Sequence, residues 1–204
     1  MIACNTATGA AVKTLRARFS IPIIAMEPAV KPAAAHTKTG VIGVLATSGT
    51  IASDNFAKLY TRFCADVKIL MQACPGLVEQ VEAGDLSGDK TRALVERYVG
   101  PLLAQKADTI VLGCTHYPFL ASPIQEIAGP MVSIIDPAAA IARELRRRLA
   151  SIKQLSPEVR AGTERFWTSN APDTAQPIIS QLWQAEIDVR SLPNGSSAEA
   201  TLEN

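Results

Sequence analysis

Several features that would assign a broad class of protein are missing from this 204-residue chain. No apolar run reaches the roughly 20 residues that cross a bilayer, and no charged and apolar leader precedes Cys4. The net charge of +1 gives no general electrostatic attraction to nucleic acid or to an anionic membrane. We therefore expect neither a nucleic-acid nor a membrane partner.

The four cysteines lack C-x-x-C spacing, which is typical of many zinc sites and of redox-active pairs. Without a leader sequence, this pattern predicts reduced thiols in a cytoplasmic protein. The chain also has no glycine-rich nucleotide-binding loop and no motif that indicates pyridoxal phosphate. We therefore expect no cofactor and no bound metal.

What the chain does contain is an alternation of apolar, β-branched runs with segments of helical periodicity. This alternation is typical of an α/β fold with a mainly parallel sheet flanked by helices. We expect strands at 40–46, 66–74, 108–114 and 131–136, and helices at 52–63, 89–105 and 136–150. Pro101 is predicted to kink or divide its helix, Asp136 to cap the last one, and Pro137 to occupy its first position.

Two segments far apart in the chain share one pattern, "MIACNTATGA" and "IVLGCTHYPF". Each has an apolar strand end, a small residue, a cysteine and a nearby threonine. Since ligands of parallel α/β folds sit at the carboxyl ends of strands, Cys4 and Cys114 are predicted to face one another across a cleft. Free N–H groups in the following turns predict that these thiols ionise more readily than Cys64 and Cys74, which we interpret as small buried residues.

Two thiols on opposite sides of a ligand suit inversion of a stereocentre, because one removes a proton and the other returns one. His116 could accept a proton from Cys114 or stabilise its anion, although a structural histidine is the alternative. His36 is interpreted as structural. Thr47 and Thr50 flank a glycine in a turn that either binds a carboxylate or caps a helix.

The stretches "ACNTAT" and "GCTHYPFL" together resemble the glutamate racemases, cofactor-independent enzymes that supply D-glutamate for bacterial peptidoglycan and hence for cell-wall growth and cell shape. The segments "GVLATSGTIAS", "ACPGLVEQVEAGDL" and "TERFWTSNAP" extend the resemblance over most of the chain. It implies an isomerase in which Cys4 and Cys114 are the two catalytic acid–base groups.

The same resemblance implies roles for the residues around both cysteines. The residues matching substrate-holding positions are Asn5, Thr6, Thr115 and His116, and Thr47 and Thr50 are further candidates. His116 is also implied to assist Cys114 as a catalytic group. Glu82 is implied to support the same side, with Glu79 as an alternative. Glutamate is the implied substrate, and the resemblance allows a homodimer.

Members of this family have two similar α/β lobes with the active site between them. We assign residues 1–28 and 137–194 to the first lobe and 29–136 to the second, with 27–40 as a connector and 195–204 as a disordered tail. The family's opening strand with Asp-Ser-Gly, and its later Tyr-Gly pair, do not occur in this chain. We therefore expect a truncated chain with an incomplete first lobe and weak or no activity.

Three alternatives stay open at this point. The substrate could be another amino acid or a hydantoin, as in other racemases of the superfamily. From another enzyme class, Cys4, Cys114, His116 and Glu82 could bind zinc in a hydrolase. The chain could also be a non-catalytic binding remnant. Metal analysis and an assay with L-glutamate would separate these alternatives.

Overall fold

The computed structural model describes residues 1–156 and 162–193. These form two compact units, which we describe separately. One comprises Met1–Val81 and Asp85–Ser156, and the other comprises 82–84 and 162–193. The predicted lobe boundaries stay a prediction, and the predicted tail at 195–204 lies outside the described residues.

The first unit is built on a parallel four-stranded sheet with the order β2-β1-β3-β4. The strands are β1 (Val41–Ala46), β2 (Lys68–Ala73), β3 (Thr109–Leu112) and β4 (Ser133–Ile135). All four predicted strands are confirmed, with shorter bounds than the apolar runs suggested. Because the strands are parallel, their carboxyl ends share one edge of the sheet, where Thr47, Cys74 and Gly113 follow β1, β2 and β3.

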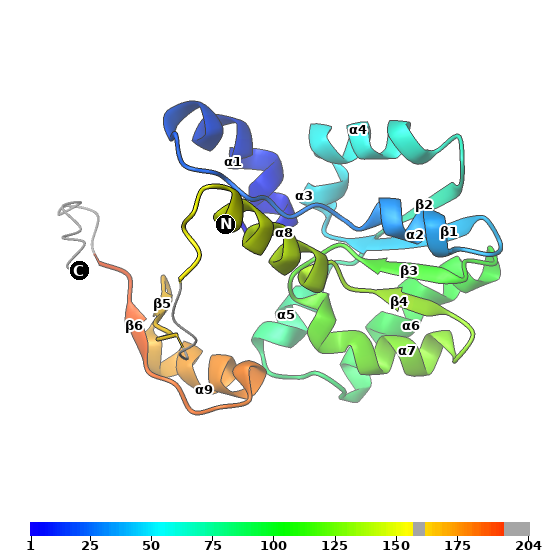
Figure 1. The fold of residues 1–204 in the computed structure, drawn as a ribbon. Helices are drawn as coiled ribbons and strands as arrows, with labels where there is room; N and C mark the ends of the chain where they lie inside the picture. The colour runs from blue at the N-terminus through cyan, green and yellow to red at the C-terminus, as the bar shows by residue number, and fades with distance from the viewer. Residues whose placement is uncertain (157–161, 194–204) are drawn as a thin grey trace. The chain divides into compact units, whose positions relative to one another are not determined.

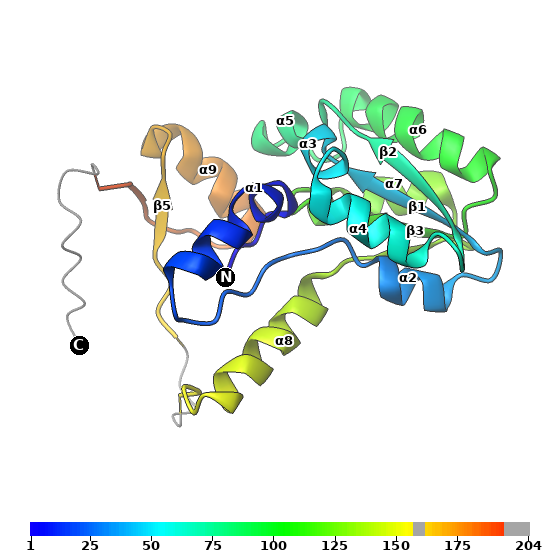
Figure 2. The same ribbon diagram turned by 90° about the horizontal axis from the view of Figure 1, so that it is seen from above.

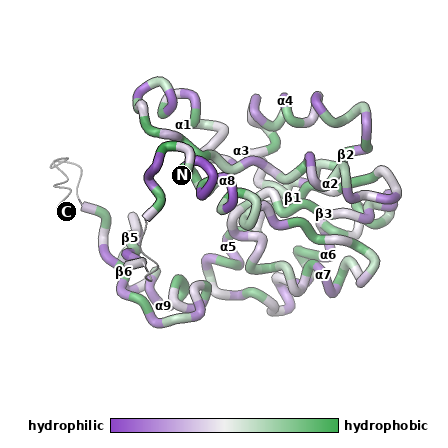
Figure 3. Tube along the Cα trace, viewed as in Figure 1, coloured by the Kyte–Doolittle hydropathy of each residue, from purple (hydrophilic) through white to green (hydrophobic). Residues whose placement is uncertain are grey.

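The two central strands, β1 and β3, carry the core. Figure 3 shows hydrophobic residues along both, and Ile42, Val44 and Ile110 are completely buried. Burial on both faces explains why their sequences are continuously apolar instead of alternating. At Gly43 in β1, an added Cβ would lie 2.6 Å from Leu102 Cδ1. The helix that carries Leu102 therefore packs directly on the backbone of β1.

Helices cover both faces of this sheet (Figure 1). One face is covered by α2 (Val30–His36) and α4 (Asp54–Phe63), and the other by α6 (Asp89–Ala104), with α7 (Ala121–Ala128) packed beside it. The interpretation of 27–40 as a plain connector is wrong, because α2 lies within it and buries Val30 and Ala33 in the core. Its alanines favour helix, and Pro32 is tolerated in the first turn.

Two helix details differ from the sequence predictions. Pro101 lies inside α6, near its C-terminal end, and does not divide it. Helix α8 (Ala138–Ser151) begins one residue later than predicted, so Pro137 is its N-cap residue and not its first residue. The carboxylate of Asp136 still accepts a hydrogen bond from the Ala138 N–H at 2.8 Å, which satisfies one free donor of the first turn.

The N-terminal segment pairs only locally with the chain that follows α1 (Asn5–Arg18). Ile2 and Ala25 form an isolated parallel bridge, with hydrogen bonds from Ile2 N to Ile24 O at 2.7 Å and from Met26 N to Ile2 O at 3.1 Å. The predicted extended segment before Cys4 is therefore present, but as one bridge.

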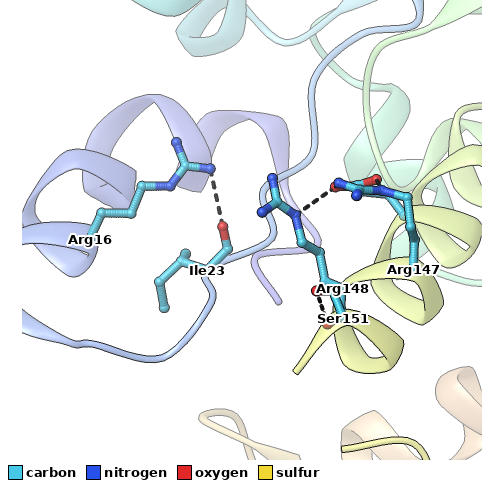
Figure 4. A network of polar contacts seen from close by, with 6 residues as sticks. Arg16, Ile23, Arg147, Arg148 and Ser151 are labelled. Atoms are coloured by element: carbon cyan, nitrogen blue, oxygen red, sulfur yellow. Dashed lines mark hydrogen bonds and ion pairs between the residues drawn. The ribbon is translucent and has the colours of Figure 1, made fainter. Parts of the chain in front are cut away.

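A cavity of about 680 Å³ lies between α1, the segment 19–27 and α8. In it Arg16 donates to the carbonyl of Ile23, while Arg147 and Arg148 pair with Glu144 (Figure 4). Helix α8 extends away from the sheet and buries none of its residues (Figure 2). This part of the unit is more open than the sheet.

The second unit contains the parallel pair β5 (Phe166–Thr168) and β6 (Val189–Ser191), with α9 (Pro172–Trp183) between them in the chain. The rings of Phe166 and Trp183 meet edge to face at 5.2 Å. No helix in the described parts of the chain is long and apolar enough to span a membrane.

Candidate active site

Cys4 occupies the N-cap position of α1, between the Ile2 bridge and the helix. Its Sγ accepts a hydrogen bond from the Ala7 N–H at 3.5 Å, and the side chain is half-buried. A sulfur at this position faces the free N–H groups of the first helical turn, which favour negative charge.

Cys114 follows β3 after a single glycine. Gly113 N–H donates to Leu45 O at 2.7 Å, and a Cβ on Gly113 would lie 2.7 Å from the same oxygen. Only glycine lets the chain stay this close to β1 as it leaves the sheet. The turn begins at Cys114, which is buried, and continues into the 3₁₀ helix η1 (Tyr117–Leu120).

The two cysteine turns meet through Asn5. Its side-chain Nδ2 donates to Gly113 O at 2.7 Å, in a buried hydrogen bond that joins positions 108 residues apart. The Cys4 and Cys114 thiols are close enough to interact electrostatically. The structure thus brings the predicted pair together within the first unit, while their catalytic role stays a prediction.

Burial raises the pKa of Cys114 above the ordinary value, although the backbone N–H groups of His116 and Thr115 lower it in part. That Cys4 and Cys114 ionise more readily than Cys64 and Cys74 stays a prediction. Burial also raises the pKa of Cys74 to about 12. The interpretation of Cys64 as buried is wrong, because it is exposed at the C-cap of α4.

The imidazole of His116 lies beside the second thiol, with Nδ1 at 3.7 Å from Cys114 Sγ. Thr115 and His116 are both half-buried. Glu82 is exposed at the end of α5 (Leu77–Glu82) and belongs to the second unit, so its role beside Cys114 stays a prediction. Glu79 is also exposed on α5.

A cluster of three threonine hydroxyls links α1 to α3 (Ser48–Ile51). Thr6 Oγ1 lies 2.8 Å from Thr47 Oγ1 and 3.0 Å from Thr50 Oγ1, and Thr47 Oγ1 also accepts from the Thr50 N–H at 3.1 Å. The helix-cap interpretation of Thr47 is confirmed. Binding of a carboxylate by these hydroxyls stays a prediction.

Sequence reasoning missed the residues that support the second turn. Tyr117 is completely buried, and its hydroxyl donates to Cys74 O at 3.4 Å. Tyr98 donates to the next carbonyl, Pro75 O, at 2.7 Å. A tyrosine inside an apolar stretch is the available signal, since a buried hydroxyl needs a partner.

In residues 1–156 and 162–193, no group of three or more His, Cys, Asp or Glu side chains is arranged to hold a metal ion. Metal analysis stays the test of the zinc-hydrolase alternative, since Glu82 belongs to the second unit and the other three residues to the first.

Comparison with known proteins identifies the family. The sequence pattern of the Asp/Glu/Hydantoin racemase family matches residues 1–145. The chain belongs to this family. It is similar to the glutamate racemase of Pseudomonas paraeruginosa, with 50% identity over 94% of this chain and 72% of the relative, and to that of Methylococcus capsulatus, with 50% identity over 97% and 73%.

Solved racemase structures agree in fold with this family member. Glutamate racemase isoform RacE1 from Bacillus anthracis superimposes with a TM-score of 0.79 at 32% identity, covering 94% of this chain and 72% of that one. The Escherichia coli glutamate racemase, solved with L-glutamate and the activator UDP-MurNAc-ala, gives 0.76 at 29% identity, covering 93% and 71%. The predicted α/β fold with a parallel sheet is confirmed.

Proposed function

We propose that this chain interconverts L- and D-glutamate by a two-base mechanism. The observation that carries the proposal is the hydrogen bond from Asn5 Nδ2 to Gly113 O, which brings the turns of Cys4 and Cys114 together. Similarity to glutamate racemases at 50% identity supports glutamate as the substrate. The E. coli structure with L-glutamate bound is consistent with this choice.

In the proposed reaction, one cysteine thiolate takes the α-proton from one face of glutamate. The other cysteine thiol gives its proton to the opposite face of the carbanion, and the two groups exchange roles in the reverse direction. The raised pKa of Cys114 suits a thiol that starts as the proton donor. Cys4, at the N-cap of α1, would then be the group that takes the α-proton.

The neighbouring groups would hold substrate and carbanion by preorganised hydrogen bonds, since we propose no cofactor or metal. Thr115 and His116 follow one thiol, and Asn5 and Thr6 follow the other. His116, at 3.7 Å from Cys114 Sγ, would share its proton during turnover. The threonine cluster of Thr6, Thr47 and Thr50 would bind a carboxylate, and Glu82 would support the side of Cys114.

We further propose that residues 1–204 by themselves turn over slowly. Cys4 begins α1, and the far end of this helix adjoins the open part of the first unit, where α8 buries no residue and Phe19 and Ile21 are exposed. Few contacts therefore hold Cys4 in line for proton transfer, and a misplacement of about 1 Å costs roughly 100-fold in rate. The cellular role would be supply of D-glutamate for peptidoglycan, in the cytoplasm.

The decisive experiment is racemisation in D2O. We expect purified 1–204 to convert L-glutamate into D-glutamate that carries deuterium at Cα, with little deuterium in recovered L-glutamate. This distribution follows from two bases that each face one side of the substrate. Deuterium in recovered substrate ahead of product would contradict the two-base mechanism, and no exchange at all would contradict the function.

Three controls give this experiment its meaning. The Pseudomonas paraeruginosa enzyme, assayed in parallel, sets the reference rate, and equal rates would contradict slow turnover. Cys64→Ser is a matched thiol replacement outside the site, because Cys64 is exposed at the end of α4, and it should leave exchange unchanged. L-aspartate and a hydantoin test the two other substrate classes of the family.

A further inference from the structure

Asn5 is a polar residue whose side chain is almost completely buried. It is 5% exposed, although it stands in the first turn of α1, next to the half-buried Cys4. Its amide nitrogen donates to Gly113 O at 2.7 Å. Its Oδ1 is also buried and has no hydrogen-bond partner among the described residues. Among the described residues, the hydrogen bonding of this side chain is therefore directed entirely at one backbone carbonyl.

That carbonyl belongs to a rigid part of the molecule. Gly113 N–H bonds to Leu45 O at 2.7 Å, and no room exists for a Cβ at this position. The residue on its C-terminal side is Cys114, and the residue on the N-terminal side of Asn5 is Cys4. The bond thus joins the immediate chain neighbours of both thiols, and it fixes the more open turn to the sheet.

A second side-chain link of α1, through Thr6, holds a different part of the unit. Thr6 reaches Thr47 and Thr50 on α3, which follows β1 and carries no cysteine. Losing that link would let α1 move relative to α3, whereas losing the Asn5 bond acts directly on the separation of the thiols.

We propose that Asn5 is a positioning residue that sets the separation of the Cys4 and Cys114 thiols through its hydrogen bond to Gly113, a role that rests on the proposed two-base function. The role differs from contact with substrate, because it operates in the protein without any ligand. It requires the donor N–H of the amide and not its shape.

The test variant is N5D, which keeps the shape and replaces the donor by a carboxyl group. Burial raises the pKa of a carboxyl group, and its neutral form donates O–H to a carbonyl. Below that pKa the link to Gly113 is restored, and above it a carboxylate faces the carbonyl oxygen and the link is broken. One variant therefore switches the bond with pH, which controls for misfolding.

Thr8→Val is the matched control. Thr8 lies one turn further along α1, is 2% exposed, and has a hydroxyl without a partner among the described residues. Replacing an unpaired buried hydroxyl by a methyl group of the same shape is close to neutral. This variant changes a buried polar group of the same helix without changing the link.

The measurement is cross-linking of Cys4 to Cys114 by bifunctional methanethiosulfonates of graded spacer length, in ligand-free protein, quantified by mass spectrometry. Wild-type protein and Thr8→Val should favour the same narrow range of spacers at pH 6 and pH 9. N5D should match them at pH 6. At pH 9 its cross-linking at the preferred spacer should fall at least about tenfold, with a broader spacer preference.

Glutamate exchange in D2O provides the second readout. At pH 9 the kcat of N5D should fall about 100-fold relative to wild type, because the alignment of the two thiols is lost. A spacer preference of N5D equal to wild type at both pH values would overturn the positioning role, even if activity were lost. A changed spacer preference in a chain that exchanges no glutamate would uphold positioning and reject the proposed function.

Discussion

The turn that carries Cys114 and the turn that carries Cys4 have the same local plan and very different support. Cys114 follows β3, a completely buried central strand, and is backed by buried Tyr117. Cys4 follows the single Ile2–Ala25 bridge and begins a helix with three buried residues. One thiol is part of the core, and the other is attached to it.

In the proposed two-base site, the two turns therefore differ in how firmly they are held and in how deeply their thiols are buried. The buried turn provides fixed geometry at the cost of a raised pKa for Cys114. The open turn leaves Cys4 half-buried beside the Ala7 N–H. A site assembled from one rigid and one attached turn depends on the contacts between them, above all on the bond from Asn5 to Gly113.

The largest expected effect comes from removing either thiol. Cys4→Ser and Cys114→Ser should each lower racemisation by more than about 10³-fold, because each removes the acid or base of one face. Circular dichroism at increasing enzyme concentration measures the loss. Each variant should still eliminate a leaving group from a suitable glutamate analogue, since one base remains. Racemisation retained near the wild-type rate by either variant would contradict the two-base mechanism.

The next prediction compares how much stability is lost when an isoleucine before each cysteine is replaced by alanine. Ile110→Ala, at a fully buried position of β3, should destabilise the protein by about 2–5 kcal/mol. Ile2→Ala, at a half-buried position, should cost about 1 kcal/mol or less. Urea unfolding, monitored by far-UV circular dichroism, gives the free energy of unfolding of each variant. Equal losses would show that the two segments are equally well packed.

A smaller effect is expected from the imidazole beside Cys114. His116→Asn should lower kcat by roughly 10–100-fold, because it removes a proton partner 3.7 Å from Cys114 Sγ. The loss should be larger in the direction in which Cys114 acts as base. Initial rates from L- and D-glutamate measure this asymmetry. Equal losses of kcat from both enantiomers would assign His116 a structural role.

The smallest expected effect is in thiol chemistry without substrate. At pH 8, iodoacetamide should label Cys4 and exposed Cys64 roughly tenfold faster than Cys114, because burial raises the Cys114 pKa and limits access. Raising the pH should increase the labelling of Cys114, because a larger fraction of its thiol then ionises. Cys74, with a pKa of about 12, should react last. Peptide mass spectrometry gives the order, and Cys114 reacting before Cys64 would contradict it.

Burial of the thiols also predicts a dependence of stability on pH. The folded-state pKa of Cys74 lies near 12, above its ordinary value of 9.0, so folding favours the protonated thiol. Its contribution to stability is complete below about pH 9 and is lost as the pH rises toward 12. Cys74→Ala should flatten this alkaline loss in urea titrations at pH 8 and pH 11.

The sequence was sufficient where local pattern and burial coincide. Continuous β-branched runs predicted β1 and β3, because strands covered on both faces need no polar side. The proximity of Cys4 and Cys114 was also predicted, but from two strand ends, whereas Cys4 follows an isolated bridge outside the sheet. The helix α2 was not predicted, because a segment with prolines and alanines resembles a linker until its contacts with the core are known.

The features that depend on tertiary contacts could not be predicted. Nothing near Asn5 in the chain points to Gly113, and nothing near Thr6 points to Thr47. The raised pKa of Cys114 depends on what covers it, whereas the sequence revealed only the favourable N–H groups of its turn. Cys64 showed the opposite error, because a lone cysteine is usually a small buried residue, whereas this one is exposed at a helix end.

The 108-residue separation of Asn5 and Gly113 also has a consequence for the order of folding. During synthesis the turn of Cys4 leaves the ribosome before β3 does, so the carbonyl that Asn5 contacts does not yet exist. Contacts so distant in sequence close slowly, because the entropy of the intervening chain must be lost first. We therefore expect the bond from Asn5 to Gly113 to form only after β3 has joined β1.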